Sequence, residues 1–238
     1  MFSALLKSDD AQRASEVVDG LLAAGFRGAL TGSLAVEAQL RAHGRAIGSC
    51  ALNDLDFVVE SFDAIPRSLA DRFLSHHVHP NAPEGRTLLQ LVDRERGLRL
   101  DLFGAFGTTL TRAHALDEQT GRLPVLAVED LVARTTAHVC GHLRKGRAVD
   151  VKHVRALTRL AGLGEPAQLA DAWRDHRQEV PGTLEEAGQQ VNELLGRRPD
   201  LLVRETYSAV VTACDRCRDR GPFHRVAPDV IVGILGYW

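Results

Sequence analysis

Two aspartates stand one residue apart at the start of an apolar run, in the stretch "LNDLDFVVE" that begins at residue 52. In a β-strand alternate side chains share a face, so Asp54 and Asp56 point the same way, with Cα atoms roughly 6.5–7 Å apart. Two carboxylates this close repel each other. The pair is tolerated if both groups are solvated at a strand end, or if a cation lies between them.

Two further features of the N-terminal half bear on that choice. Asp101 lies in "LRLDLFG", where alternation places Leu100 and Leu102 on one face of a strand and the carboxylate on the other. A lone charge among apolar residues needs water or a partner. The dipeptide Gly32-Ser33 falls at a turn from a short strand into a helix, where backbone N–H groups can face a phosphate.

Three carboxylates from two strands suit two hard divalent cations, Mg²⁺ or Mn²⁺. Such ions take oxygen ligands and polarise a triphosphate during an in-line displacement. We therefore predict that Asp54, Asp56 and Asp101 are catalytic metal ligands, and that Gly32 and Ser33 bind the nucleotide. If Asp101 instead has a structural role, Arg99 or an arginine of the C-terminal half is the expected partner.

The elements that must position these residues follow from local patterning. We expect a helix over residues 8–24, a strand in "FRGALTGS", a helix over 34–42 and a strand in "LDFVVE". A helix over 65–74 and strands in "RTLLQLVD" and "LRLDLFG" follow. The stretch "TLTRAHALDEQTGRLPVLA" is typical of a hairpin or an extended excursion, with a turn near residues 120–121.

From residue 128 onward the pattern has the helical period, with segments expected over residues 128–143, 148–161, 167–178, 183–195 and 201–217. The sequence therefore predicts an α+β fold, in which a mixed sheet with flanking helices (residues 1–126) is followed by an all-helical domain (residues 127–238).

Composition limits the class of protein. The 238 residues are 45% hydrophobic, which suffices for a packed core, and the net charge of -2 leaves no basic footprint for nucleic acid. We see neither an export segment nor an apolar run of membrane-spanning length, and expect a cytoplasmic protein without membrane contact. The sequence gives no signal for an oligomeric state.

The ordered set Gly32-Ser33, Asp54-Leu55-Asp56 and Asp101 resembles the nucleotidyltransferase superfamily, whose fold is shared with the palm of DNA polymerase β. The stretch "LPVLAVEDLVARTTAHVCGHLRKGRAVDVKHVRAL" looks like the helical region of the abortive-infection toxin type and related minimal nucleotidyltransferases. The resemblance covers about residues 27–160. It implies that residues 1–126 form the catalytic domain, which transfers a nucleoside monophosphate from an NTP to a hydroxyl acceptor and releases pyrophosphate.

A basic stretch follows the catalytic half, and its residues are Arg134, Arg144, Lys145, Arg147 and Lys152. Both a solvated helix face and a nucleotide-binding face fit this pattern. In the functional interpretation, Arg134, Lys145 and Lys152 contact the triphosphate, which ATP or another NTP supplies.

Several alternatives stay open. Thr135 and Val149 stand where the toxins tend to carry lysines, with Lys152 nearby, and this favours a catalytically silent member that binds a nucleotide or a partner protein. A glycosyltransferase also uses an Asp-x-Asp pair. The acceptor is a small molecule such as an aminoglycoside, a protein side chain, or a tRNA end, which is the only nucleic acid we expect as a partner.

Two other groups have metal-ligand spacing. His138 and His142 are four residues apart on one expected helix, but no glutamate follows His138 as in a zinc peptidase, and a helix face near the active site is favoured. Cys214 and Cys217 form half of a zinc site, and we interpret them as ordinary thiols.

Overall fold

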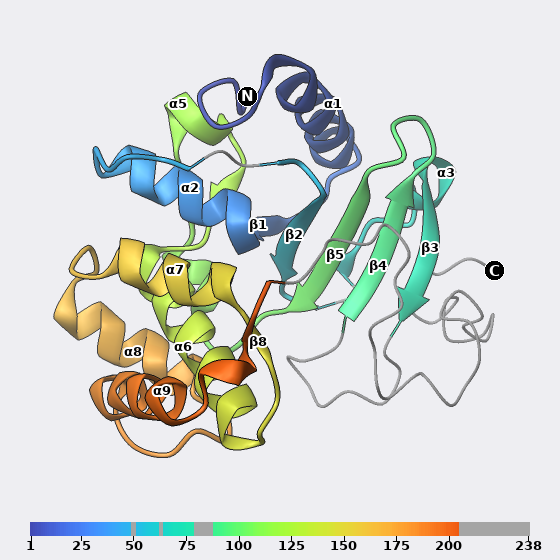
Figure 1. Ribbon diagram of the computed structural model, residues 1–238. Coiled ribbons are helices and arrows are strands. Elements are labelled where there is room, and N and C mark those ends of the chain that lie inside the picture. Colours follow the sequence, from blue (N-terminus) through green and yellow to red (C-terminus); the bar gives the residue numbers. More distant parts are fainter. Residues whose placement is uncertain (49–50, 62–63, 79–87, 205–238) are drawn as a thin grey trace.

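The computed structural model describes residues 1–48, 51–61, 64–78 and 88–204 (Figure 1). The first half consists of α1 (Ser8–Ala23), β1 (Gly28–Thr31), α2 (Gly32–Ala42), β2 (Asp54–Val59), α3 (Leu69–Arg72), β3 (Phe73–Val78), β4 (Leu88–Asp93) and β5 (Arg99–Gly104). A short connection contains α4 (Thr109–Arg112), β6 (His114–Ala115), α5 (Asp117–Thr120) and β7 (Pro124–Val125). The remainder comprises α6 (Val128–Arg144), β8 (Val149–Asp150), α7 (Val151–Leu160), α8 (Pro166–His176), α9 (Leu184–Arg197), a 3₁₀ turn (Pro199–Leu201) and β9 (Leu202–Val203).

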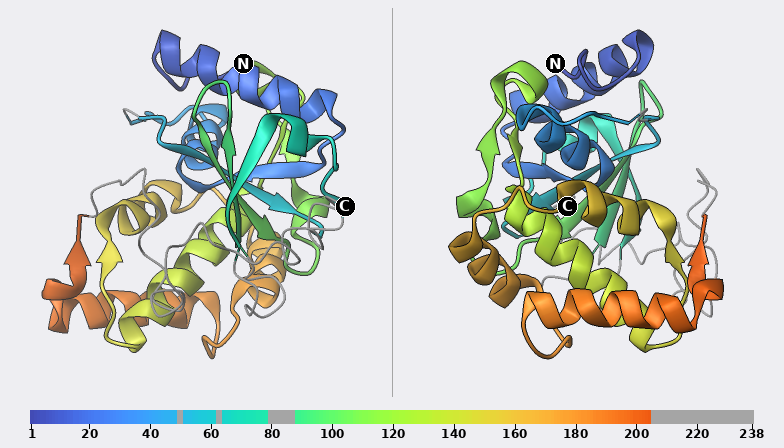
Figure 2. Two further views of the ribbon diagram at one scale, coloured as in Figure 1. Left: turned by 90° about the vertical axis from the view of Figure 1, so that its right-hand side faces the viewer. Right: turned by 60° about the vertical axis from the view of Figure 1, so that its left-hand side comes forward.

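The main sheet has seven strands in the order β3-β4-β5-β2-β1-β7-β6. The pairs β2/β5 and β1/β7 are parallel, and the other neighbours are antiparallel. In Figures 1 and 2, α1 and α2 lie above this sheet, whereas α6, α8 and α9 lie below it. The predicted α+β class with a mixed sheet is therefore confirmed. The mainly helical part adds one feature that the sequence did not predict, the short parallel pair of β8 and β9.

Alternation along the two central strands separates the core from the site. Leu55, Phe57, Leu100 and Leu102 are fully buried and belong to the core that also contains the apolar faces of α1 and α2. Burial of such side chains is the main favourable term in folding, worth about 1.5–3 kcal/mol for each one. The residues between them face the other side of the sheet, toward the helical half.

The helical half has a hydrophobic core of its own, which includes Val139, Leu143, Trp173 and Val191. Its long helix α6 contributes to both cores, because Leu131 near its start packs with the sheet residues. Since α6 begins at residue 128, the predicted limit between residues 126 and 127 falls just before it. The division into two domains stays a prediction.

Two local predictions differ from the structure. The helix expected over residues 65–74 is reduced to Leu69–Arg72, because Phe73 begins a strand that pairs antiparallel with β4. Pairing with a neighbour outweighs a local helical pattern, which carries no information on the partner strand. Near the start of the helix expected over residues 201–217, Leu202–Val203 form β9 instead. The later part of that segment, with Cys214 and Cys217, lies outside the described residues.

Residues 109–127, expected to form a hairpin or an extended excursion, contain the antiparallel pair of β6 and β7, with α5 between the strands. Gly121 follows α5 with φ of 58°, a conformation that glycine adopts without strain. In the part of the chain that the structure describes, none of the helices is both long enough and apolar enough to cross a lipid bilayer.

Candidate metal and nucleotide site

The candidate site is built on a row of residues that crosses four strands. Pairing across β1, β2, β5 and β4 places Thr31 opposite Asp56, Asp56 opposite Asp101, and Asp101 opposite Gln90. Directly opposed residues of neighbouring strands point to the same face of a sheet. The parallel pairing of β2 with β5 therefore brings together two carboxylates that are 45 residues apart in the chain.

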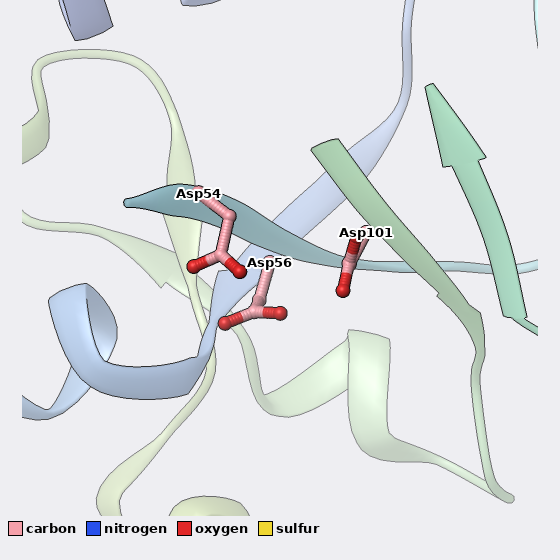
Figure 3. A group of neighbouring side chains, drawn as sticks. All are labelled: Asp54, Asp56 and Asp101. Carbon is pink, nitrogen blue, oxygen red and sulfur yellow. The ribbon is translucent and has the colours of Figure 1, made fainter. Parts of the chain in front are cut away.

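Asp54, Asp56 and Asp101 form one compact group, the carboxylate group (Figure 3). One oxygen from each side chain lies within 4.8 Å of the corresponding oxygens of the other two. Asp101 is only 7% exposed, whereas the other two aspartates keep more of their surface accessible. Among the described residues this is the single group of three or more His, Cys, Asp or Glu side chains with such close ligand atoms.

The carboxylate group is electrostatically unfavourable without a cation. Burial among protein atoms, together with repulsion from Asp54 and Asp101, raises the pKa of Asp56 well above its ordinary value. Burial and the nearby Asp54 also raise the pKa of Asp101, to about 6, although Arg99 opposes this shift. Hard divalent cations prefer such an arrangement of carboxylate oxygens, so the three residues fit Mg²⁺ or Mn²⁺.

Two neighbouring side chains contact the carboxylates. Arg99, opposite Asp54 in the sheet, forms an ion pair with Asp54, and its Nε lies 3.1 Å from Oδ1 of Asp101. Gln90 donates from Nε2 to both oxygens of Asp101, at 3.0 and 3.2 Å. Arg99 was anticipated as a partner of Asp101. Gln90 was not, although a single amide in the apolar run "TLLQLVD" was a signal of the same kind as Asp101 itself.

Both the backbone conformation at position 32 and the space around it require a glycine there. Its φ is 70°, and a Cβ built on it would lie 2.0 Å from Oδ2 of Asp56. A side chain here would therefore displace a carboxylate as well as strain the backbone. Ser33 follows in the first turn of α2 and is exposed. The start of this helix, with its backbone amide groups, lies beside the carboxylate group (Figure 3). Unpaired N–H groups at a helix N-terminus bind anions such as phosphate.

The helical half contributes two positive charges near Asp56. Arg134 of α6 and Lys152 of α7 both lower the pKa of Asp56 through their charge. The guanidinium carbon of Arg134 lies 4.6 Å from the centre of the Phe103 ring, and its Nη1 is buried with no hydrogen-bond partner in the described part of the chain. Lys152 is exposed, with Nζ 3.7 Å from Oδ2 of Asp150. Such groups can bind phosphate oxygens.

The third predicted nucleotide ligand lies elsewhere. Lys145 follows the C-terminal end of α6, where its Nζ forms a 2.9 Å ion pair with Glu179, whereas Lys152 is a lysine whose charge lowers the pKa of Asp56. The pair His138 and His142 does lie on one side of α6. The two rings are 4.3 Å apart between centres, and His153 of α7 lies 4.9 Å from His138.

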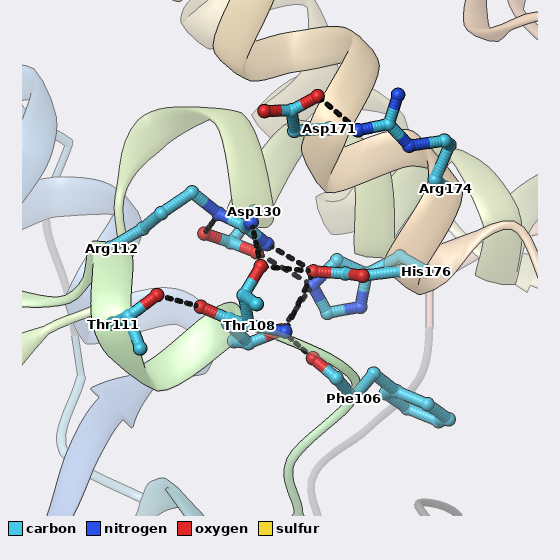
Figure 4. A network of polar contacts seen from close by, with 10 residues as sticks. Phe106, Thr108, Thr111, Arg112, Asp130, Asp171, Arg174 and His176 are labelled. Atoms are coloured by element: carbon cyan, nitrogen blue, oxygen red, sulfur yellow. Dashed lines mark hydrogen bonds and ion pairs between the residues drawn. The ribbon is translucent and has the colours of Figure 1, made fainter.

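A buried polar network fixes the start of α6 relative to the segment after β5 (Figure 4). Arg112 donates from Nε and Nη2 to the two oxygens of Asp130, at 2.8 and 2.6 Å, and from Nη2 to Asp175 at 2.7 Å. His176 of α8 lies 2.9 Å from the same Asp130. Residues four apart share a helix face, so Asp130 anchors the turn that carries Arg134.

No protein-family model and no curated protein matches the chain. Two solved structures are similar to it. JHP933 from Helicobacter pylori is 10% identical, with a TM-score of 0.35 over 82% of this chain and 94% of that one. A candidate nucleotidyltransferase from H. pylori is 13% identical, with a TM-score of 0.30 over 84% of this chain and 97% of that one. Both TM-scores are too low to establish a common fold, so function must be inferred from the geometry of the chain itself.

Proposed function

We propose that the protein is a metal-dependent nucleotidyltransferase that transfers a nucleoside monophosphate from an NTP to a hydroxyl acceptor and releases pyrophosphate. The observation that carries this proposal is the carboxylate group, whose ligand oxygens lie within 4.8 Å beside the N-terminus of α2. A set of hard oxygen ligands next to an anion-binding helix start is suited to a metal-bound triphosphate.

Asp54, Asp56 and Asp101 would hold Mg²⁺ or Mn²⁺, which when bound supplies Lewis-acid polarisation of phosphate and hydroxyl oxygens. The N–H groups of Gly32 and Ser33 would bind phosphate oxygens at the start of α2. Arg134 and Lys152, whose charges act on Asp56, would add positive charge that stabilises the leaving pyrophosphate. These roles follow the resemblance of Gly32-Ser33, Asp54-Leu55-Asp56 and Asp101 to the superfamily pattern.

A contribution of Lys145 to the nucleotide site also remains part of the proposal, but its ion pair with Glu179 would first have to open. The acceptor stays open among a small molecule such as an aminoglycoside, a tRNA end and a protein side chain. A cytoplasmic location belongs to the proposal as well, because nucleoside triphosphates are available there.

The proposal is tested with purified protein, each of the four α-labelled NTPs, Mg²⁺ or Mn²⁺, and acceptors of the three classes. Transfer of label together with pyrophosphate release is expected with one or more acceptors, and no transfer is expected from Asp56→Asn. Calorimetry in parallel should show NTP binding with metal and little binding in excess chelator, because carboxylates repel a triphosphate unless cations intervene. Equal affinity in chelator would contradict the metal site.

A second candidate is a catalytically silent protein that binds a nucleotide or a partner protein at the same place. Thr135 and Val149, at positions where the similar toxins tend to carry lysines, favour it. Metal-dependent NTP binding without transfer to any acceptor class would support this candidate over the enzyme.

A further inference from the structure

Arg99 is in contact with two of the three members of the carboxylate group. Its guanidinium forms an ion pair with Asp54, and its Nε lies 3.1 Å from Oδ1 of Asp101. The side chain is 15% exposed, so these contacts are partly shielded from water. Arg99 precedes Asp101 by two residues on β5, which places both side chains on the same face of the sheet.

We infer that Arg99 is a resident counter-cation that occupies the carboxylate group while no metal is bound, and that an incoming divalent ion must displace it. This inference rests on the proposed metal site and concerns how that site is kept and filled. Three ionised carboxylates without a cation would repel one another strongly, and a guanidinium between two of them reduces that repulsion.

Two physical effects make Arg99 a competitor of the metal. A carboxylate oxygen that accepts a charge-assisted hydrogen bond from Arg99 has less electron density to offer a cation. A fixed positive charge within hydrogen-bonding distance of the ligands also repels a divalent ion directly. Both effects weaken metal binding, so removing the guanidinium should strengthen it.

The opposite role is that of a positioning partner, in which Arg99 holds Asp54 and Asp101 in the geometry that the metal requires. Loss of the side chain would then let the carboxylates move apart and would weaken metal binding. Gln90 also restrains Asp101, through two hydrogen bonds from a neutral amide, so Asp101 keeps a positioning partner when Arg99 is removed. The two roles therefore predict opposite signs for the same measurement.

The experiment measures the Kd of Mn²⁺ alone, by calorimetry or by the electron paramagnetic resonance signal of free Mn²⁺. The proteins compared are the native chain, Arg99→Gln, Arg99→Lys and the control Arg72→Gln. Arg72 of α3 pairs with the buried Asp93 of β4 at 2.6 Å, so its loss also breaks an arginine-aspartate pair, but outside the carboxylate group. Arg99→Gln should lower the Kd about fivefold to tenfold, which is the size expected when one competing ionic hydrogen bond is removed. The Kd of Arg99→Lys should fall between those of the native protein and Arg99→Gln. The Kd of Arg72→Gln should match that of the native protein.

A measurement on the native protein avoids dependence on how the variants fold. The Nε–H resonance of Arg99 should shift, and its exchange with water should accelerate, when Mg²⁺ is titrated in, whereas the Arg72 resonance should not change. Unchanged or weaker Mn²⁺ binding by Arg99→Gln, or an Arg99 resonance insensitive to Mg²⁺, overturns the inference and leaves the metal site standing. If the native protein binds no Mn²⁺, the proposed function and the inference both fail.

Discussion

At the scale of single residues, the three aspartates are not equivalent. Asp54 and Asp56 lie on β2 and keep accessible surface, whereas Asp101 on β5 is buried and accepts hydrogen bonds from Gln90. In a two-metal site the paired aspartates help to hold the triphosphate, while the third mainly serves the activation of the nucleophile. The roles should therefore separate when each carboxylate is replaced by an amide.

We expect Asp54→Asn and Asp56→Asn to weaken metal-dependent NTP binding at least tenfold, by roughly 1.4 kcal/mol or more, and to abolish transfer. Asp101→Asn should retain most of the binding and lose turnover by roughly a hundredfold or more, as when an interaction used in the transition state is removed. Calorimetry and single-turnover transfer measure the two quantities. Transfer by Asp101→Asn at the native rate would exclude Asp101 as the third ligand.

The raised pKa of Asp101 also predicts a pH-dependent stability. Its folded-state pKa of about 6 lies above the ordinary value of 3.8, so the folded protein binds more protons than the unfolded chain between these pH values. The free energy of unfolding of metal-free protein should therefore fall as the pH rises through this range. Above pH 6, Asp101→Asn should be more stable than the native chain by about 1–3 kcal/mol.

Urea denaturation in chelator at pH 4 and pH 7 measures the difference in the free energy of unfolding between Asp101→Asn and the native chain, which should shrink at the lower pH. In saturating Mg²⁺ the native chain should be the more stable of the two, since only it gains the full binding energy of the metal. A metal-free Asp101→Asn variant that is several kcal/mol less stable at pH 7 would show instead that Asp101 is a structural partner of Arg99.

At the scale of elements, the start of α2 is fixed by the absence of a side chain. Gly32→Ala would place a Cβ where Oδ2 of Asp56 now lies, at a backbone φ of 70°. We expect this variant to lose metal-dependent NTP binding by about tenfold or more and to be destabilised by about 1–3 kcal/mol. Gly44→Ala is a matched control, since its φ is 67° but nothing lies within 4 Å of the added atom. Equal NTP affinity in both variants would contradict a role for this turn.

The two lysines of the helical half provide a second comparison between elements. Lys152, near the start of α7, acts on Asp56, whereas Lys145, just after α6, is paired with Glu179. Both are exposed lysines with the same charge. Lys152→Gln should raise the Kd for Mg-NTP about threefold to tenfold, and Lys145→Gln should raise it less, because the ion pair of Lys145 with Glu179 must first open. Titration of both variants with the same NTP checks this. A larger effect of Lys145→Gln would assign the nucleotide to the other end of α6.

At the scale of the whole molecule, the two hydrophobic cores are connected through α6 and through the network around Arg112. Arg112→Gln would leave Asp130, which is fully buried, without its bidentate partner. Removing one partner of a buried ion pair typically costs about 3–5 kcal/mol. We therefore expect a comparable loss in the free energy of unfolding, together with weaker NTP binding because Arg134 lies one turn beyond Asp130.

The control for this substitution is Arg174→Gln, which removes the exposed pair with Asp171 in the same region (Figure 4). Exposed pairs are worth about 0–1 kcal/mol, so the stability of this variant should change little. Chemical denaturation gives both values. Similar stabilities of the two variants would mean that the network does not hold α6 in place.

The sequence by itself determined the α+β class, the strands that carry the aspartates, the glycine turn and the four long helices after residue 128. These features depend on periodicity and on turn residues, which are local properties of the chain. Arg134 and Lys152 were singled out because the basic stretch follows directly on the catalytic half, and in the structure the charges of both act on Asp56. Their contact with a nucleotide stays a prediction.

Only the tertiary structure decided which strands are neighbours. The parallel pairing of β2 with β5 sets Asp56 opposite Asp101, and the pairing of β4 with β5 brings in Gln90 from a run that has no other sign of function. The strand at residues 73–78 and the ion pair of Lys145 with Glu179 depend equally on partners distant in sequence. Periodicity assigns a side chain to a face, but strand order and register select its partners, and these follow from the packing of the whole chain.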